Sequence, residues 1–108
     1  MDVQLKRGLL EVCVLSAIRG EATYGYRIIK ELSPVVEITE STLYPILRRL
    51  EAAGSLSVES AEHNGRLRKY YRLTAAGEAR IRDFFLDWEE MDRIHTYIAE
   101  KEVPHEKT

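Results

Sequence analysis

The sequence predicts an α+β fold, mainly α with a small β-hairpin and a long helix at its C-terminal end. Residues 1–54 hold three apolar-periodic stretches that each stop at Gly or Pro, and residues 56–73 alternate around an Asn-Gly pair. Residues 74–102 then repeat apolar side chains at heptad spacing. With 108 residues, 44% of them hydrophobic and 31% charged, the chain has the size and composition of one domain with a modest core.

The first two helices are predicted over residues 3–19 and from Thr23 onward. Apolar residues lie on nearly all sides of the first segment up to Gly20, so this helix must be buried on more than one side. Thr23 is a suitable N-cap for the second helix, which is short and ends at Ser33-Pro34.

The third helix is predicted to begin near Thr39–Ser41, either of which could be its N-cap, and to end at Gly54. Its apolar residues recur at i, i+3, i+4 and i+7 and are predicted to face the core: Leu43, Ile46, Leu47 and Leu50. The opposite face carries Ser41, Pro45 and Arg48, flanked by Tyr44 and Arg49. This face is therefore free to meet a partner.

Two strands are predicted over residues 56–61 and 67–73, joined through His63-Asn64-Gly65-Arg66 in a hairpin. Alternation in the second strand places Leu67, Lys69, Tyr71 and Leu73 on one side and Arg66, Arg68, Tyr70 and Arg72 on the other. We expect the first side to face the core, with Tyr71 and Leu73 buried, and the second to form a basic ribbon.

The charge is distributed unevenly along the chain. The net charge is -2, but residues 1–72 carry 11 Lys+Arg against 9 Asp+Glu, a net of +2, whereas residues 73–108 carry 5 against 9, a net of -4. Residues 63–72 hold four cations and no acid. Because salt screens each charge over about 8 Å, a phosphate backbone responds to this local strip more than to the net charge.

The C-terminal helix is predicted from Thr74 to about Glu102. Alternating spacings of three and four residues define a seam that packs along another helix: Ile81, Phe84, Trp88, Met91, His95 and Ile98. About 28 residues at 1.5 Å each span roughly 42 Å, which is longer than one small core covers. We therefore expect these six residues to form a dimer interface.

The order of helix, helix, helix, hairpin and long helix predicts a winged helix-turn-helix with a long C-terminal dimerisation helix. We expect a DNA-binding domain at 1–73, a dimerisation helix at 74–102 and a flexible tail at 103–108. The predicted contacts to double-stranded DNA are Tyr26, Ser41, Thr42, Tyr44, Pro45, Arg48, Asn64, Gly65, Arg66, Arg68 and Lys69. The alternative is a winged helix that binds a protein and neither DNA nor a ligand.

Three segments carry a resemblance to the PadR family of bacterial regulators. They are Tyr-Gly-Tyr at 24–26 with Ile28-Ile29, Ser-Thr-Leu-Tyr-Pro-Ile-Leu-Arg-Arg-Leu-Glu at 41–51 with Gly54, and Arg-Lys-Tyr-Tyr-Arg-Leu-Thr at 68–74 with Gly77. The resemblance covers residues 5–77. It implies a homodimeric repressor that binds a pseudo-palindromic operator.

The short C-terminal part resembles the subfamily with one long terminal helix. Trp88 followed by Asp92 is similar to the arrangement in a lactococcal member whose paired tryptophans stack on flat drugs at the dimer interface. The resemblance implies a planar aromatic ligand, for which the candidate residues are Leu10, Glu11, Phe85, Trp88, Glu89 and Asp92. From periodicity alone, Trp88 is equally a packing residue of the interface, and His95 is a seam residue or a pH sensor.

Other functional classes find no support in the sequence. Gly-rich phosphate loops, nucleophile elbows and paired carboxylates in apolar settings are missing, so we expect no enzyme. Cys13 and the three histidines lack zinc-ligand spacing, so we expect no metal and no cofactor. Neither a membrane-spanning run nor a signal peptide is apparent, which predicts a cytoplasmic protein without a membrane partner.

Overall fold

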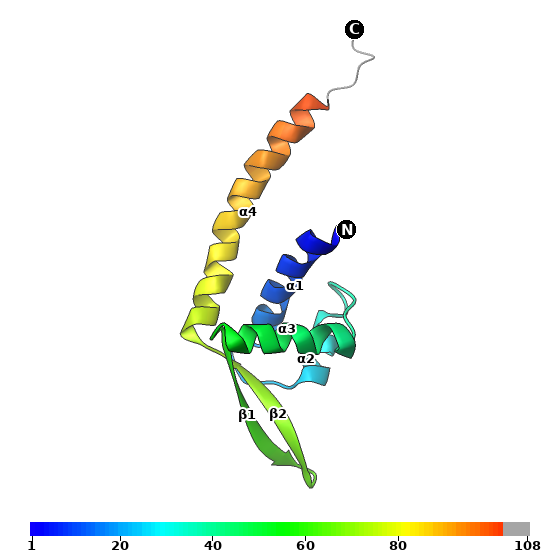
Figure 1. The fold of residues 1–108 in the computed structure, drawn as a ribbon, viewed down its shortest axis with the longest axis vertical. Helices are drawn as coiled ribbons and strands as arrows, with labels where there is room; N and C mark the ends of the chain where they lie inside the picture. The colour runs from blue at the N-terminus through cyan, green and yellow to red at the C-terminus, as the bar shows by residue number, and fades with distance from the viewer. Residues whose placement is uncertain (103–108) are drawn as a thin grey trace.

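The computed structural model describes residues 1–102 and confirms the predicted α+β fold with its long C-terminal helix. Figure 1 shows three short helices packed together, with the hairpin extending to one side of them and the long helix to the other. The elements in chain order are α1 (Val3–Ala17), α2 (Gly25–Leu32), α3 (Glu40–Ala52), β1 (Leu56–His63), β2 (Arg66–Leu73) and α4 (Ala75–Lys101). The tail predicted at 103–108 lies outside the described residues.

Side-chain caps define where α1 and α4 begin. The Asp2 carboxylate accepts hydrogen bonds from the amides of Gln4 (3.1 Å) and Leu5 (3.2 Å) at the start of α1. The Thr74 hydroxyl accepts from the amide of Gly77 (3.1 Å) and donates to the carbonyl of Gly54 (2.6 Å). Thr74 thus caps α4 and also ties it to the end of α3.

The prediction that Thr23 caps the second helix is wrong. Tyr24 occupies the N-cap position of α2, and Thr23 pairs with β2 instead. The Thr23 amide donates to the Tyr71 carbonyl (3.1 Å), and the Tyr71 amide donates to the Thr23 carbonyl (2.7 Å). Two backbone hydrogen bonds to a neighbouring strand thereby hold Thr23 in an extended conformation, which a side-chain cap pattern cannot reveal.

The hairpin turns through two residues, as the Asn-Gly pair predicts. Asn64 (φ 53°) and Gly65 (φ 79°) both adopt the left-handed conformation that a tight primed turn requires. The strands extend to His63 and Arg66, so β1 is longer than predicted. The register pairs Val58 with Tyr71, which places both on one side of the hairpin.

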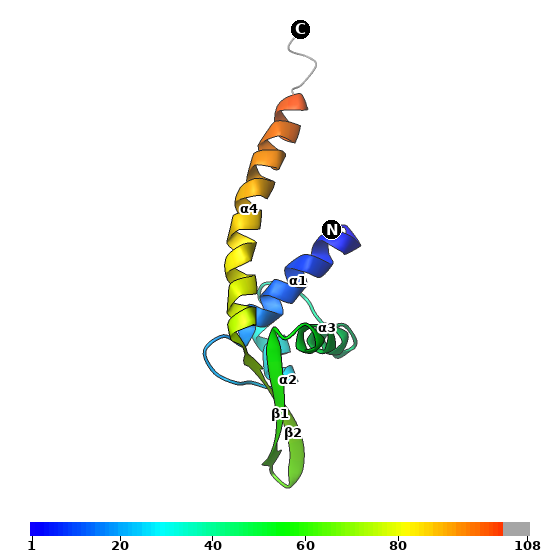
Figure 2. The same cartoon turned by 60° about the vertical axis from the view of Figure 1, so that its left-hand side comes forward.

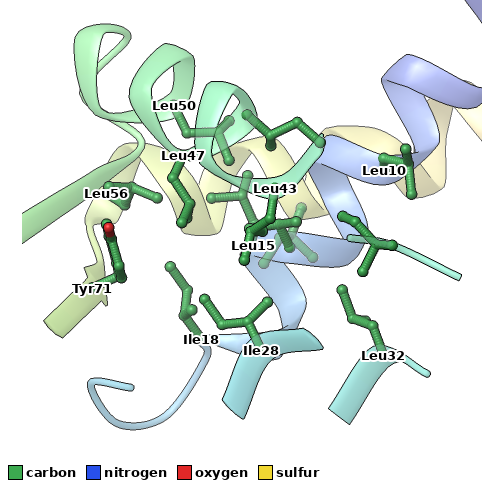
Figure 3. Close-up of a cluster of buried hydrophobic side chains, with 14 residues drawn as sticks. Leu10, Leu15, Ile18, Ile28, Leu32, Leu43, Leu47, Leu50, Leu56 and Tyr71 are labelled. Atoms are coloured by element: carbon green, nitrogen blue, oxygen red, sulfur yellow. The ribbon is translucent and has the colours of Figure 1, made fainter. Parts of the chain in front are cut away.

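The core lies where α1, α2 and α3 meet the base of the hairpin (Figure 3). The four apolar residues predicted for α3 are all buried, as is Tyr71 of β2, and Leu73 is half-buried. Ile81 was predicted to lie in the dimer interface, but it is 3% exposed and belongs to this core, because the first turns of α4 pack on the N-terminal helices. The remaining core residues are Leu10, Val14, Leu15, Ile18, Ile28, Leu32, Ile38 and Leu56.

Beyond this core, α1 and α4 leave apolar surface without cover. Figures 1 and 2 show the two helices diverging, with most of α4 projecting past the packed helices. Phe84 is half-buried, but Trp88 is 52% exposed, and Met91 and Ile98 are exposed as well. The apolar seam therefore continues beyond what this chain covers. No helix within residues 1–102 is both long enough and apolar enough to cross a membrane.

Candidate nucleic-acid interface

The exposed side of α3 has a centre and two flanks. Because Leu43 and Leu47 face the core, Ser41 and Arg48 lie at the outermost line of the helix, and both are exposed. Tyr44 lies on the flank toward the hairpin, whereas Thr42 lies on the opposite flank. The helix thus presents hydroxyl groups and a guanidinium outward.

Three hydroxyl groups gather at the first turn of α3. Thr39 is the N-cap, and its Oγ1 lies 3.0 Å from Ser41 Oγ and 3.3 Å from Thr42 Oγ1. The amide groups of this turn point out of the helix end, where the helix dipole favours a negative charge. This end is well suited to a phosphate oxygen.

A solvent-open hollow of about 920 Å³ lies between the hairpin, α2 and the flank of α3. The wing residues Arg66 and Lys69 line it, and the exposed Tyr26 lines it from α2. The structure brings six of the predicted DNA contacts to this hollow: Tyr26, Tyr44, Asn64, Arg66, Arg68 and Lys69. One basic concave surface therefore joins the hairpin to the exposed side of α3.

Arg68 is held in place by aromatic side chains. Its guanidinium carbon lies 4.0 Å from the centre of the Tyr24 ring. Tyr24 in turn packs edge-on against Tyr70, with the ring centres 5.9 Å apart. Stacking on one face of the guanidinium leaves its N–H groups free to donate in the plane. Tyr24 is thus a supporting residue of the interface, although the sequence analysis named it only in the family resemblance and not among the predicted DNA contacts.

Two predictions for the second strand of the hairpin differ in the structure. Leu67 was expected to face the core but is 80% exposed, because the tip of the hairpin extends past the packed helices and nothing covers its inner side. Arg72 lies 3.5 Å from the Glu59 carboxylate on β1, so an acid of the neighbouring strand offsets part of the positive charge. The hairpin is consequently most basic toward its turn, at Arg66, Arg68 and Lys69. Lys69 is exposed although strand alternation placed it on the side expected to face the core.

Glu40 is a further residue of this surface that sequence reasoning missed. It opens α3, is exposed, and lines the hollow beside Tyr44. A carboxylate in the first turn stabilises a helix dipole, and in a major groove it can accept a hydrogen bond from a cytosine amino group. The sequence could have identified Glu40 as a residue of this surface, because it lies one helical turn before Tyr44 and therefore on the same flank of α3.

Thr42 and Pro45 lie apart from the hollow beside the hairpin. They line a second depression with Arg49, and α1 forms its other wall with Lys6 and Arg7. The predicted contacts therefore occupy both flanks of α3, with Ser41 and Arg48 between them.

The residues predicted for ligand binding are divided among several places. Trp88 lines a hollow of about 750 Å³ between α1 and α4, where the acidic wall is formed by Asp83 and Asp87. Glu89 and Asp92, also candidate ligand residues, are exposed on α4 and lie outside that lining. Phe85 borders a neighbouring apolar depression instead.

Leu10 and Glu11 of α1 lie away from the Trp88 hollow. Leu10 is a core residue, and Glu11 is bound by two arginines, Arg49 and Arg80. Burial tends to raise the pKa of Glu11, but hydrogen bonds from Arg80 and Arg49 outweigh it and hold the pKa below its ordinary value of 4.5. Glu11 is therefore an ionised link between helices and does not line the hollow for which it was a candidate ligand residue.

These elements define a class of protein: a winged helix-turn-helix whose third helix and basic hairpin share one surface, followed by a long helix with an uncovered apolar seam. The family model described as the transcriptional regulator PadR-like family matches residues 14–83, from the last turn of α1 into α4. The chain belongs to this family, whose members are transcription regulators and not enzymes.

Known relatives share both sequence and fold with the chain. A PadR family transcriptional regulator from Eggerthella lenta is 35% identical, with a TM-score of 0.80 over 91% of this chain and 88% of its own. A transcriptional regulator of Mycobacterium tuberculosis, Rv3488, is 33% identical over 83% of this chain and 85% of its own. Bacillus subtilis PadR, solved in complex with operator DNA, shares the fold at 22% identity, with a TM-score of 0.66 over 71% of this chain and 46% of its own.

Proposed function

We propose that the protein is a homodimeric transcriptional repressor that binds a pseudo-palindromic operator in double-stranded DNA. The observation that carries this proposal is the surface shared by α3 and the hairpin, on which Tyr44, Arg66 and Lys69 are exposed. Membership of a family of transcription regulators supports it, as does the operator complex of the structurally similar Bacillus subtilis PadR.

In the proposed complex, α3 lies in the major groove. Ser41 and Arg48 face the base edges because they are at the outermost line of the helix, and Tyr44 and Thr42 reach the phosphates on either side. The hydroxyl cluster at Thr39 receives a phosphate at the helix end. These residues supply both positioning and base contacts.

The hairpin follows the adjacent DNA backbone. Asn64 and Gly65 form the turn at the end of the hairpin, which extends beyond the packed helices in Figure 1. The exposed Arg66 next to this turn is proposed to reach phosphates or the minor groove. Arg68 meets the DNA in a fixed orientation because of its stacking on Tyr24. These contacts are expected to carry affinity and salt dependence and little sequence information.

A second copy of the chain covers the seam of α4 in this proposal. Exposed apolar side chains at Trp88, Met91 and Ile98, together with Leu5 on the diverging end of α1, form more uncovered apolar surface than a small monomer usually presents. A twofold dimer would present two copies of α3 to two half-sites, which accounts for the expected symmetry of the operator.

The hollow at Trp88 is the proposed site of a planar aromatic ligand. In a dimer the partner would close this open hollow, and the exposed indole would offer a face for stacking. Asp83 and Asp87 would favour a positive charge on the ligand. Such a ligand would release the operator if it bound a dimer geometry with a different spacing of the two α3 helices.

We place the protein in the bacterial cytoplasm, with the DNA it would regulate.

The test is selection of bound fragments from random duplexes, followed by electrophoretic mobility shift with the enriched sequence. A repressor of this kind should enrich one pseudo-palindrome and bind it more tightly than random duplex at the same salt concentration. The competing function is a winged helix that contacts only proteins. Failure to enrich any sequence, together with no shift at low salt, would favour that competitor.

A further inference from the structure

Glu11 connects three helices through one carboxylate. It lies on α1, which packs against both α3 and α4 and runs between them in Figure 2. Its Oε2 is 3.2 Å from Nε of Arg49 on α3, and its Oε1 is 2.7 Å from a terminal guanidinium nitrogen of Arg80 on α4. Each oxygen thus serves a different helix.

This arrangement differs from an exposed surface ion pair. The Glu11 side chain is only 15% exposed, so a large part of its hydration has been replaced by the two guanidinium groups. A carboxylate removed from water is costly without such partners, and both arginines donate directional, charge-assisted hydrogen bonds. Moving α3 relative to α4 would stretch at least one of these bonds and leave the carboxylate undersatisfied.

The two helices joined by Glu11 have different tasks in the proposed function. The exposed face of α3 meets DNA, and the uncovered seam of α4 meets the second copy of the chain. The angle between them therefore sets the distance between the two α3 helices of a dimer.

We propose that Glu11 is a positioning residue that holds α3 at a set angle to α4 and thereby determines which half-site spacing the dimer accepts. This inference rests on the proposed dimeric DNA binding. It assigns Glu11 a role in the geometry of operator recognition, without contact to DNA or to a ligand.

The chain offers a matched control for this idea. Arg19, just after α1, lies 3.2 Å from Glu78 of α4, and both side chains are more exposed than Glu11. This pair also reaches α4 but does not involve α3. Glu78→Gln therefore makes the same chemical change as Glu11→Gln without altering the link to α3.

The experiment measures binding of the full-length protein to its selected operator and to versions with one base pair added or removed between the half-sites. One base pair moves the half-sites by about 3.4 Å and rotates them. On the altered spacings, the wild-type protein and Glu78→Gln should each bind about tenfold or more weakly than they bind the selected operator. Glu11→Gln should bind the altered spacings only about threefold more weakly. The difference is within the range of coupling between sites. A residue that only stabilises the fold would weaken all spacings alike.

A second variant, Arg80→Gln, breaks only the α4 side of the link and should relax the spacing preference in the same way. It serves as the decisive variant if circular dichroism shows that Glu11→Gln is unfolded. If the folded variants lose as much affinity on the altered spacings as the wild-type protein does, the inference is overturned while the proposed function stays intact. A wild-type protein that binds no duplex would instead remove the proposed function, and the inference with it.

Discussion

The hydroxyl group of Tyr44 on α3 lies against the backbone of Gly25 at the start of α2. A Cβ on residue 25 would lie 2.5 Å from Tyr44 Oη, closer than real side chains approach. Gly25 is buried and Tyr44 is partly exposed, so the same tyrosine both packs α3 on α2 and lines the proposed DNA surface. The absence of a side chain at residue 25 is what permits this packing.

Gly25→Ala is expected to destabilise the protein by about 1 to 3 kcal/mol, because the new methyl group must displace the Tyr44 ring. In the Tyr44→Phe background the cost should be smaller, since the nearest remaining ring atom is 3.1 Å from the new Cβ. Urea denaturation of the four proteins in this double-mutant cycle measures the difference. An equal cost in both backgrounds would show that the hydroxyl contact is not the cause.

Arg66→Ala and Arg68→Ala should each weaken binding to operator and random duplex about equally and lower the salt slope by about 1, because both residues are proposed to contact phosphates. Lysine should substitute better at 66 than at 68, since only Arg68 is oriented by stacking on Tyr24. Titrations at several salt concentrations provide both quantities. If neither alanine variant changes affinity or salt slope, the basic hairpin is simply a solvated surface.

Met91→Glu should convert the proposed dimer to a monomer, because the substitution places a charge in the apolar seam of α4. Light scattering of the wild-type protein should give about twice the chain mass of 12.5 kDa. Leu86→Glu is the matched control, since Leu86 is exposed on the opposite side of the same helix. A wild-type monomer at micromolar concentration would contradict the proposed assembly.

A planar aromatic cation should quench the fluorescence of Trp88, the only tryptophan of the chain, and weaken operator binding. Asp83→Asn with Asp87→Asn should reduce the affinity for cationic compounds more than Glu89→Gln with Asp92→Asn, because only the first pair lines the hollow. Fluorescence titration with dyes and drugs gives these affinities. If the Trp88→Ala variant stays dimeric and binds the same compounds equally well, Trp88 is only a packing residue.

Acid should weaken the link at Glu11. Its pKa is lower in the folded protein than its ordinary value of 4.5, so its contribution to stability is present above that value and is lost as the pH falls through the folded pKa. The difference in free energy of unfolding between the wild-type protein and Glu11→Gln should therefore shrink as the pH is lowered from 7 to below 4.5. A difference that stays constant over this range would argue against the double arginine contact.

Much of the fold could be predicted because its signals are local. Asn64-Gly65 supplies the two left-handed residues that a tight hairpin needs, and Thr74 caps the helix that follows it. The apolar spacing of α3 identifies its buried face, and from that face its exposed one. Rules of local backbone conformation and side-chain periodicity are sufficient for such elements.

Other features depended on neighbours that are distant in the sequence. Thr23 pairs with Tyr71, 48 positions away, and so does not act as a cap. Leu67 follows the strand alternation correctly but lies past the end of the packed helices, so alternation indicates its side of the hairpin and not its burial.

The sequence by itself thus determined which segments form helices and strands and which residues of α3 face outward, because both follow from the local period of the chain. Only the tertiary structure decided that Asp83 and Asp87, rather than Glu89 and Asp92, share the hollow with Trp88, and that Glu11 meets Arg49 and Arg80. The reason is physical: the partners of Glu11 lie 38 and 69 residues away in sequence, and only the packing of α1 between α3 and α4 brings their charges together.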